Sequence, residues 1–217
     1  MNYLVIDLEM CNVPKMSRRN GFNCRNEIIQ IGAVLLDENY NETGRLSQYV
    51  KPQYGSIDKF IENLTGIRYA NVKHAPSVQE ALLHLIDWIG DREYRVLAWS
   101  NSDHSQLNRE LGAKRIDDER ITEFMDKERW TDYQHCFDER FGYNRATGLE
   151  HALVLCDITT EGRMHDGLDD AVNTAAIIRL LENDPDFVIE DVFSKYCSDE
   201  ECSFTLGSVF AGLGIAC

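Results

Sequence analysis

Hydrophobic residues near the start of the chain form runs that are separated by polar segments. Residues 2–10 (NYLVIDLEM) and 28–36 (IIQIGAVLL) are apolar enough to form buried strands. The polar segment 37–44 (DENYNETG) is typical of a turn, and residues 45–50 (RLSQYV) can return as a hairpin partner. The first quarter of the chain therefore predicts three neighbouring strands.

Farther along the chain, apolar residues recur at helical spacing. Ser77 is a suitable helix N-cap, and Glu80 completes a capping box. The last strong periodic segment runs from about Asp166 to Glu182. Strands are expected at residues 94–99 and 130–133, each followed by a short helix, and one more short helix is expected from Gly148 to Leu155.

The order of these elements predicts an α/β fold. Neighbouring strands followed by strands that alternate with helices indicate a mixed β-sheet flanked by α-helices. We expect the first strand at its centre, because both of its faces are apolar through Ile6. A chain of 217 residues suits one domain, which we place at 1–183, with a C-terminal extension at 184–217 packed on it.

The net charge limits the ligands that this chain can bind. With 22 Lys and Arg against 37 Asp and Glu, the formal charge is −15, whereas nucleic-acid binders usually neutralise phosphates with basic residues. Bound divalent cations can supply positive charge where a phosphate lies. The charge therefore argues against a broad basic groove and permits local contact with a short nucleic-acid segment.

Cysteine usage and hydropathy predict a cytoplasmic protein with no membrane partner. The seven cysteines are odd in number and include no CxxC pair, which is typical of reduced thiols. The N-terminal apolar run is interrupted by Asp7 and Glu9 and lacks a preceding basic residue, unlike a signal peptide. The apolar tail, Phe204 to Cys217, is too short and too Gly-rich to span a bilayer.

Two carboxylates emerge side by side from the first strand. Asp7 and Glu9 are two residues apart, so their side chains point to the same face of a strand. Buried anions without a basic neighbour must be protonated or bound to a cation. A hard divalent ion such as Mg²⁺ or Mn²⁺ suits such a pair. Two surface acids at a frayed strand end are the simpler interpretation of this pair alone.

Two further groups of residues complete the candidate site. Asp103 follows the strand at 94–99, at the kind of strand end where α/β sheets bind ligands, although it could simply cap a helix. The segment 165–170 (HDGLDD) brings His165 and Asp170 to the start of the last helix. Here too an acid-rich helix start with an incidental histidine is an alternative.

The candidates from these segments, Asp7, Glu9, Asp103, Asp170 and His165, supply four carboxylates and one histidine, which suit two-metal phosphodiester hydrolysis. Two ions about 3.5–4 Å apart clamp the scissile phosphate in such enzymes. The histidine can then take a proton from the attacking water, because its ordinary pKa near 6.5 suits that role at neutral pH.

The sequence resembles the DnaQ-like DEDDh exonucleases. The segments VIDLEM (5–10), WSNSDHSQL (99–107) and HDGLDDAVNTA (165–175) match their three motifs in order and spacing. Further matches, at EIIQIGAV (27–34) and LTGI (64–67), resemble the branch that contains the histone-mRNA 3′ exonuclease and KapD-like bacterial proteins. The resemblance covers roughly residues 3–182.

This resemblance implies a ribonuclease H-like fold, two Mg²⁺ or Mn²⁺ ions and 3′–5′ exonuclease activity. It implies that the metals are held by Asp7, Glu9, Asp103 and Asp170, and that His165 is the general base. It also implies contacts with the 3′-terminal nucleotide from Leu8, Met10, Leu64, Thr65 and Ile67. The expected partners are the 3′ ends of single-stranded RNA or DNA, with RNA weakly favoured.

Other interpretations stay open at this point. The fold could serve a catalytically weak nucleic-acid or protein-binding adaptor, since fold alone does not establish activity. A phosphohydrolase with Asp7 as nucleophile would need a second aspartate where Glu9 stands. A homodimer formed through the C-terminal extension is also considered. The sequence leaves the physiological substrate open.

Overall fold

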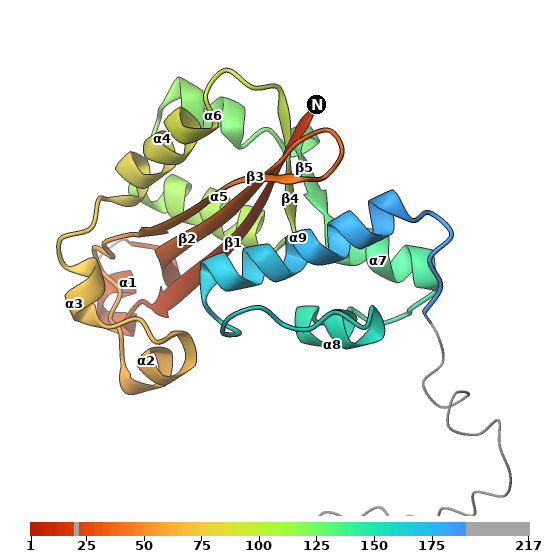
Figure 1. Ribbon diagram of the computed structural model, residues 1–217. Helices are drawn as coiled ribbons and strands as arrows, with labels where there is room; N and C mark the ends of the chain where they lie inside the picture. The colour runs from red at the N-terminus through yellow and green to blue at the C-terminus, as the bar shows by residue number, and fades with distance from the viewer. Residues whose placement is uncertain (20–21, 190–217) are drawn as a thin grey trace, which may run out of the picture. The chain divides into compact units, whose positions relative to one another are not determined.

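The computed structural model describes residues 1–19 and 22–189. A five-stranded mixed sheet forms its centre, in the order β3-β2-β1-β4-β5 (Figure 1). β1 pairs antiparallel with β2 and parallel with β4, while β3 pairs antiparallel with β2 and β5 parallel with β4. The strands are β1 (Asn2–Asn12), β2 (Asn26–Leu36), β3 (Glu42–Tyr49), β4 (Tyr94–Ala98) and β5 (Trp130–Asp132).

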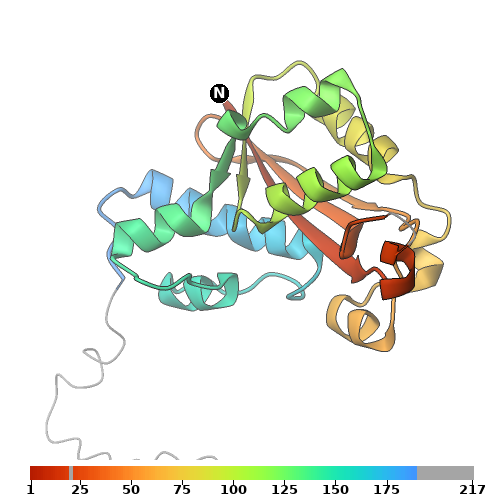
Figure 2. The same cartoon turned by 180° about the vertical axis from the view of Figure 1, so that it is seen from behind.

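Helices cover both faces of this sheet. One face carries α4, α5 and α6, and the other carries α9, with α7 and α8 beside it (Figures 1 and 2). The helices are α1 (Lys15–Arg19), α2 (Lys59–Thr65), α3 (Tyr69–Val72), α4 (Val78–Ile89), α5 (Ser102–Lys114), α6 (Glu119–Phe124), α7 (Tyr133–Phe141), α8 (Leu149–Leu155) and α9 (Gly167–Asn183), with a 3₁₀ turn at Lys127–Arg129.

The predicted architecture is confirmed. β1 is the central strand, and its residues Leu4, Ile6 and Leu8 pack in the core under α4 and α5. Ser77 caps α4 by accepting a hydrogen bond from the N–H of Glu80, whose side chain completes the capping box. Alternation along β1 leaves its other face to α9, so the strand is buried on both sides.

Buried charges fix α5 and the segment before α2 to the start of β2. The carboxylate of Glu110 accepts the N–H of Ile28 at 2.8 Å. Lys114 bridges the carboxylates of Glu110 and Glu27, at 2.8 and 2.6 Å. Glu27 also accepts three backbone N–H groups from residues 53–55. Because both glutamates are fully buried, each needs these partners.

Several short helices were not predicted. α1, α2 and α3 gather at the end of the sheet where β1 ends (Figure 1), and α6 follows α5. α2 is a seven-residue helix that begins at its N-cap Asp58 and ends at Gly66, whose φ is +74°. Helices this short depend on tertiary packing, so their sequences carry a weak periodic signal.

Residues Met1–Phe187 form one compact unit. The expected domain boundary after residue 183 coincides with the end of α9 at Asn183, and it stays a prediction. The prediction that residues 184–217 pack on the domain concerns mostly residues outside those described, and it stays a prediction. The helices of the described part include none that is long and apolar enough to cross a membrane.

Candidate active site

β1 presents the two acids of the first motif on the α9 side of the sheet. Asp7 pairs with Gly32 of β2 and Glu9 with Gln30. Asp7 is half-buried and Glu9 is buried. The β1–β2 register shifts between Glu9 and Met10, which is the kind of irregularity that re-aims side chains beside active sites.

Asp103 reaches the same strand from the first turn of α5. β4 pairs with β1 only as far as Ile6, opposite Ala98. Two residues beyond that pair, the N–H of Leu8 donates to Asp103 Oδ1 at 3.2 Å. The carboxylate of Asp103 thus continues the hydrogen bonding of β1 where β4 has ended, and the side chain is buried there.

The last motif lies at the start of α9. Asp166 caps the helix by accepting the N–H of Leu168 at 3.0 Å, and Asp170 lies in the first turn. The N–H of His165 donates to Asp170 Oδ2 at 2.9 Å. His165 has a φ of +64°, a left-handed conformation that is uncommon outside glycine. The loop thus holds this exposed histidine beside Asp170.

Close contact between β2 and α9 brings Asp170 to β1. A Cβ added at Gly32 would lie 2.0 Å from the backbone carbon and oxygen of Gly167, so only glycine fits there. Gln30 accepts the N–H of Gly167 at 3.1 Å and donates to Asp166 Oδ1 at 3.2 Å. β2 therefore sets the position of the first turn of α9.

Three of the five predicted residues are brought together in this structure. Ligand atoms of Glu9, His165 and Asp170 lie within 4.8 Å of one another. Oδ1 of Asp170 is buried and has no hydrogen-bond partner, as expected for an oxygen that would face a cation. The carboxylates of Glu9 and Asp170 offer oxygen ligands, which suit a hard divalent ion, so these residues fit the implied metals.

The electrostatics of the cluster agree with this fit. Burial, followed by the charges of Asp103, Asp170 and Glu9, raises the pKa of Asp7 well above its ordinary value. Burial raises the pKa of Glu9 to about 8, with the charge of Asp170 as the next cause. Burial also raises the pKa of Asp103 to about 7 and that of Asp170 to about 6. Without a cation, the carboxylates thus oppose one another's ionisation.

Of the residues predicted to contact the 3′-terminal nucleotide, Leu8 and Met10 flank Glu9 in β1, whereas the other three lie at or just after the end of α2. Leu8 is buried, and Met10 and Leu64 are half-buried. The buried side chain of Thr65 donates to Ile61 and accepts from the N–H of Ile67, which is itself buried. Contact of these five residues with a substrate stays a prediction.

Gln30, Gly32 and Arg163 were not identified as site residues from the sequence. The first two lie in the EIIQIGAV segment, where a glutamine and a glycine interrupt an apolar strand. A strand glycine often marks a close backbone approach, which is the signal that could have indicated their role. Arg163 lies two residues before His165 and donates to the carbonyls of Asn63 and Leu64 in α2.

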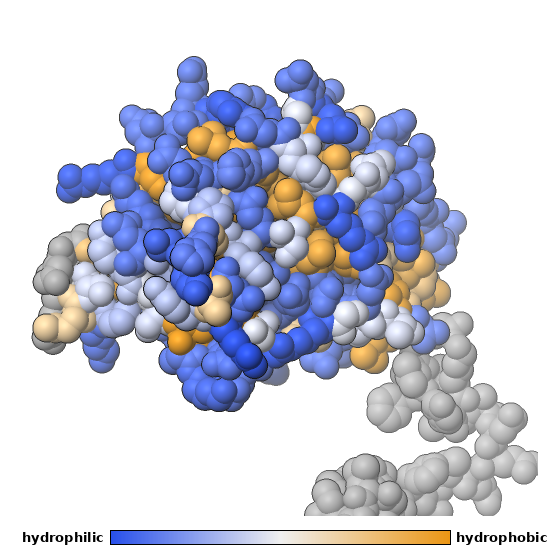
Figure 3. Space-filling model, turned by 60° about the vertical axis from the view of Figure 1, so that its left-hand side comes forward, coloured by the Kyte–Doolittle hydropathy of each residue, from blue (hydrophilic) through white to orange (hydrophobic). Residues whose placement is uncertain are grey.

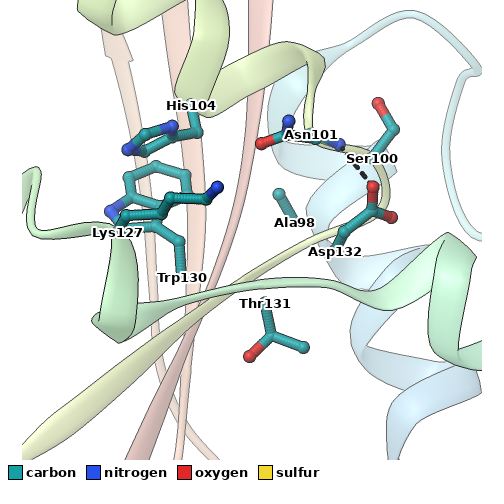
Figure 4. A pocket seen from close by; sticks show the side chains of 8 residues that line it. All are labelled: Ala98, Ser100, Asn101, His104, Lys127, Trp130, Thr131 and Asp132. Carbon is teal, nitrogen blue, oxygen red and sulfur yellow. Dashed lines mark hydrogen bonds between the residues drawn. The ribbon is translucent and has the colours of Figure 1, made fainter.

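A separate pocket of about 180 Å³ lies where β4 and β5 end, and none of the predicted site residues lines it. Figure 4 shows His104, Lys127 and Asn101 among the side chains that line it. The N–H of Asn101 donates to Asp132 at 3.2 Å. The pocket thus has a different lining from the acidic cluster.

Comparison with known proteins identifies the family. The RNase_T family, described as Exonuclease, matches residues 4–178. The chain belongs to this exonuclease family. The predicted resemblance to DEDDh exonucleases, including the histone-mRNA 3′ exonuclease, is confirmed by this match together with the relative and the solved structures that follow. One relative of this chain is the 3′-5′ exoribonuclease 1 of Rattus norvegicus, which is 29% identical over 168 residues. That alignment covers 72% of the chain and 47% of the rat protein, so the chain spans about half the length of this relative.

Solved structures confirm the fold of this family member. One, described as "3'-end specific recognition of histone mRNA stem-loop by 3'-exonuclease", has a TM-score of 0.72 and 24% identity, and covers 84% of this chain and 64% of that one. The nuclease domain of 3'hExo, described as a DEDDh family member bound to rAMP, has a TM-score of 0.69 and 24% identity. It covers 84% of this chain and 92% of that one. The ribonuclease H-like mixed sheet is thus confirmed.

Proposed function

We propose that the protein is a metal-dependent 3′–5′ exonuclease that removes nucleotides from the 3′ end of single-stranded nucleic acid. The observation that carries this proposal is the grouping of Glu9, Asp170 and His165 beside β1, where Asp103 also bonds to the strand. Membership of the exonuclease family supports it. A weak preference for RNA over DNA is supported by the name of the rat relative, 3′-5′ exoribonuclease 1.

The residues of the cluster divide into metal ligands and a proton acceptor. Asp7, Glu9, Asp103 and Asp170 would hold two Mg²⁺ or Mn²⁺ ions. When bound, such ions neutralise the scissile phosphate and activate the attacking water. The four carboxylates would be ionised in that state, because each dication offsets the repulsion that raises their pKa values.

His165 would act as the general base. A ring nitrogen of His165 lies within 4.8 Å of carboxylate oxygens of Glu9 and Asp170, which places it at the edge of the proposed metal site. A water between these groups could donate its proton to the imidazole. The backbone bond from His165 to Asp170 would keep the ring at this position when substrate arrives.

Matched RNA and DNA oligonucleotides, labelled at the 5′ end and incubated with Mn²⁺ or with chelator, test the proposal. We expect stepwise shortening from the 3′ end that chelator abolishes. Asp7→Asn should abolish it while the variant stays folded. Asp87→Asn is the matched control, because Asp87 lies on the surface of α4 and pairs with Arg120 there. Binding of the oligonucleotide without metal-dependent shortening would instead support an adaptor.

The same experiment compares the RNA and the DNA under one metal condition. The 2′-hydroxyl is the group that lets a protein tell these substrates apart. We expect faster shortening of the RNA. Equal rates, or a faster rate on DNA, would remove the RNA preference and leave the nuclease proposal intact.

A further inference from the structure

The loop that carries His165 is bonded to α9 through its backbone. Asn173 of α9 accepts the N–H of Glu161 at 2.8 Å and donates to its carbonyl at 3.0 Å. Asp169 accepts the N–H of Arg163 at 2.7 Å. These bonds fix the loop to the helix that follows it, but they leave its outer side to contacts from other elements.

The side chain of Arg163 connects this loop to α2. Its Nη2 donates to the carbonyls of Asn63 and Leu64, at 2.7 and 2.8 Å. Both carbonyls belong to the last turn of α2, where backbone oxygens lack partners within the helix and attract cations. The guanidinium thus satisfies two orphan acceptors and joins elements about 100 residues apart in sequence.

Gly66 leaves the space that the guanidinium occupies. A Cβ added at Gly66 would lie 2.1 Å from Arg163 Nη1. The φ of Gly66 is +74°, so a glycine ends α2 and also allows the arginine to approach the helix end. The turn at residues 64–67 and the His165 loop are therefore shaped to fit each other through this contact.

We propose that Arg163 is a positioning residue that clamps the His165 loop to the end of α2 and so holds His165 at the reacting phosphate. The inference rests on the proposed function, because it assigns Arg163 to the support of the general base. The clamp joins two segments. One is the loop that carries the proposed general base, and the other is the turn predicted to border the 3′-terminal nucleotide. Loss of the clamp would loosen the outer side of the loop and shift His165, while the bonds of the loop to α9 remain.

A thermal double-mutant cycle tests the clamp without any measurement of activity. Gly66→Ala should lower the Tm more in the wild-type background than in the Arg163→Ala background. In the Arg163→Ala background, the added methyl group has no guanidinium to displace. The left-handed strain of alanine is common to both backgrounds and cancels in the comparison. Equal Tm losses in the two backgrounds would overturn the clamp.

Steady-state kinetics on a single-stranded oligonucleotide with Mn²⁺ test the positioning role. Arg163→Ala should lower kcat about tenfold or more, with a smaller change in KM, and added guanidinium ion at millimolar concentration should restore part of the loss. Arg45→Ala is the matched control, because Arg45 pairs with Glu42 of β3 and with Glu161 of the same loop. Its kcat should stay within about twofold of wild type.

The outcomes separate the inference from the proposed function. An unchanged kcat in Arg163→Ala, or a raised KM with unchanged kcat, would overturn the positioning role, and the latter would indicate direct substrate contact. A wild-type protein that shortens no oligonucleotide would overturn the proposed function and, with it, the catalytic role of Arg163. The thermal cycle would still decide whether the clamp exists.

Discussion

Glu9 shows how the carboxylates depend on a cation at the scale of single residues. Its pKa in the folded protein is raised to about 8, first by burial and then by the charge of Asp170. In an unfolded chain a glutamate has a pKa of about 4.3. A group whose pKa is higher in the folded protein than in the unfolded chain stabilises the fold at a pH below its unfolded pKa. This stabilisation is lost as the pH rises through the folded pKa.

The ion-free protein should therefore lose stability as the pH rises from about 5 to about 8. Glu9→Gln removes one of the groups that cause this loss of stability. In chelator near pH 8.5, the Tm of the variant should therefore exceed that of wild type, by about 2–4 °C for each kcal/mol gained in the free energy of unfolding. Mn²⁺ should raise the wild-type Tm more than that of the variant. Thermal unfolding at about pH 5.5 and 8.5 measures both effects, and Glu150→Gln on the surface of α8 is the control. An identical pH dependence of Glu9→Gln and wild type would contradict the prediction.

The role of His165 can be separated from that of a ligand. As a general base it should contribute about 10²–10⁴-fold to turnover, so His165→Ala should slow single-turnover cleavage by that factor and leave Mn²⁺ affinity nearly unchanged. The exposed His151 of α8 supplies the matched control, His151→Ala. Because a ring nitrogen of His165 lies near Glu9 and Asp170, a large fall in Mn²⁺ affinity would indicate that it binds metal instead.

At the scale of elements, the packing of α9 on β2 determines where Asp170 lies. Gly32→Ala would place a methyl group 2.0 Å from the backbone of Gly167, and neither backbone can move without shifting the other. We expect a loss of about 1–3 kcal/mol or more in the free energy of unfolding, together with loss of activity as Asp170 moves away from β1. Urea unfolding and oligonucleotide shortening measure the two effects.

Gly112→Ala is the control for this substitution. Gly112 lies inside α5, and an added Cβ would meet nothing within 4 Å. Alanine there should stabilise the protein by about 0.5–1 kcal/mol, because glycine costs more entropy in a helix. If Gly32→Ala proved as well tolerated as Gly112→Ala, the contact between β2 and α9 would not control the site.

The elements also differ in how far the sequence could predict them. β1, β2, α4 and α9 carry strong apolar patterns or caps and lie close to where they were predicted. α2 and α3 are too short to produce such a pattern and form because Ile61, Ile67 and Val72 reach one apolar cluster. Short elements that depend on distant partners produce only a weak periodic signal in the local sequence.

The same distinction applies to the site. The spacing of Asp7 and Glu9 on one strand predicts that they share a face, and a cap at Asp166 predicts that Asp170 lies in the first turn of its helix. The roles of Gln30 and Arg163 depend on partners more than 90 residues away in sequence. Their contacts follow from tertiary packing, which periodicity and spacing do not encode.

At the scale of the whole molecule, the negative charge must be reconciled with a polyanionic substrate. The chain carries a formal charge of −15. The face shown in Figure 3 is predominantly hydrophilic, with smaller apolar patches between polar residues. The proposed site concentrates further carboxylates at the end of β1. Binding of a 3′ end would therefore depend on the metal ions and on a few local contacts rather than on a long-range attractive field.

This balance predicts a shallow salt dependence of substrate binding. Each neutralised phosphate of a single strand contributes about 0.7 to the slope of log affinity against log salt concentration. Contacts with two or three phosphates near the 3′ end should give a slope of log KM against log salt concentration of about 2 or less, measured at saturating Mn²⁺. Lengthening the oligonucleotide from about 5 to about 20 nucleotides should leave that slope unchanged, because no further phosphates are neutralised. A slope above about 4 that grows with length would instead require a basic track along the strand, and the charge of the molecule would then be a poor guide to how it binds its substrate.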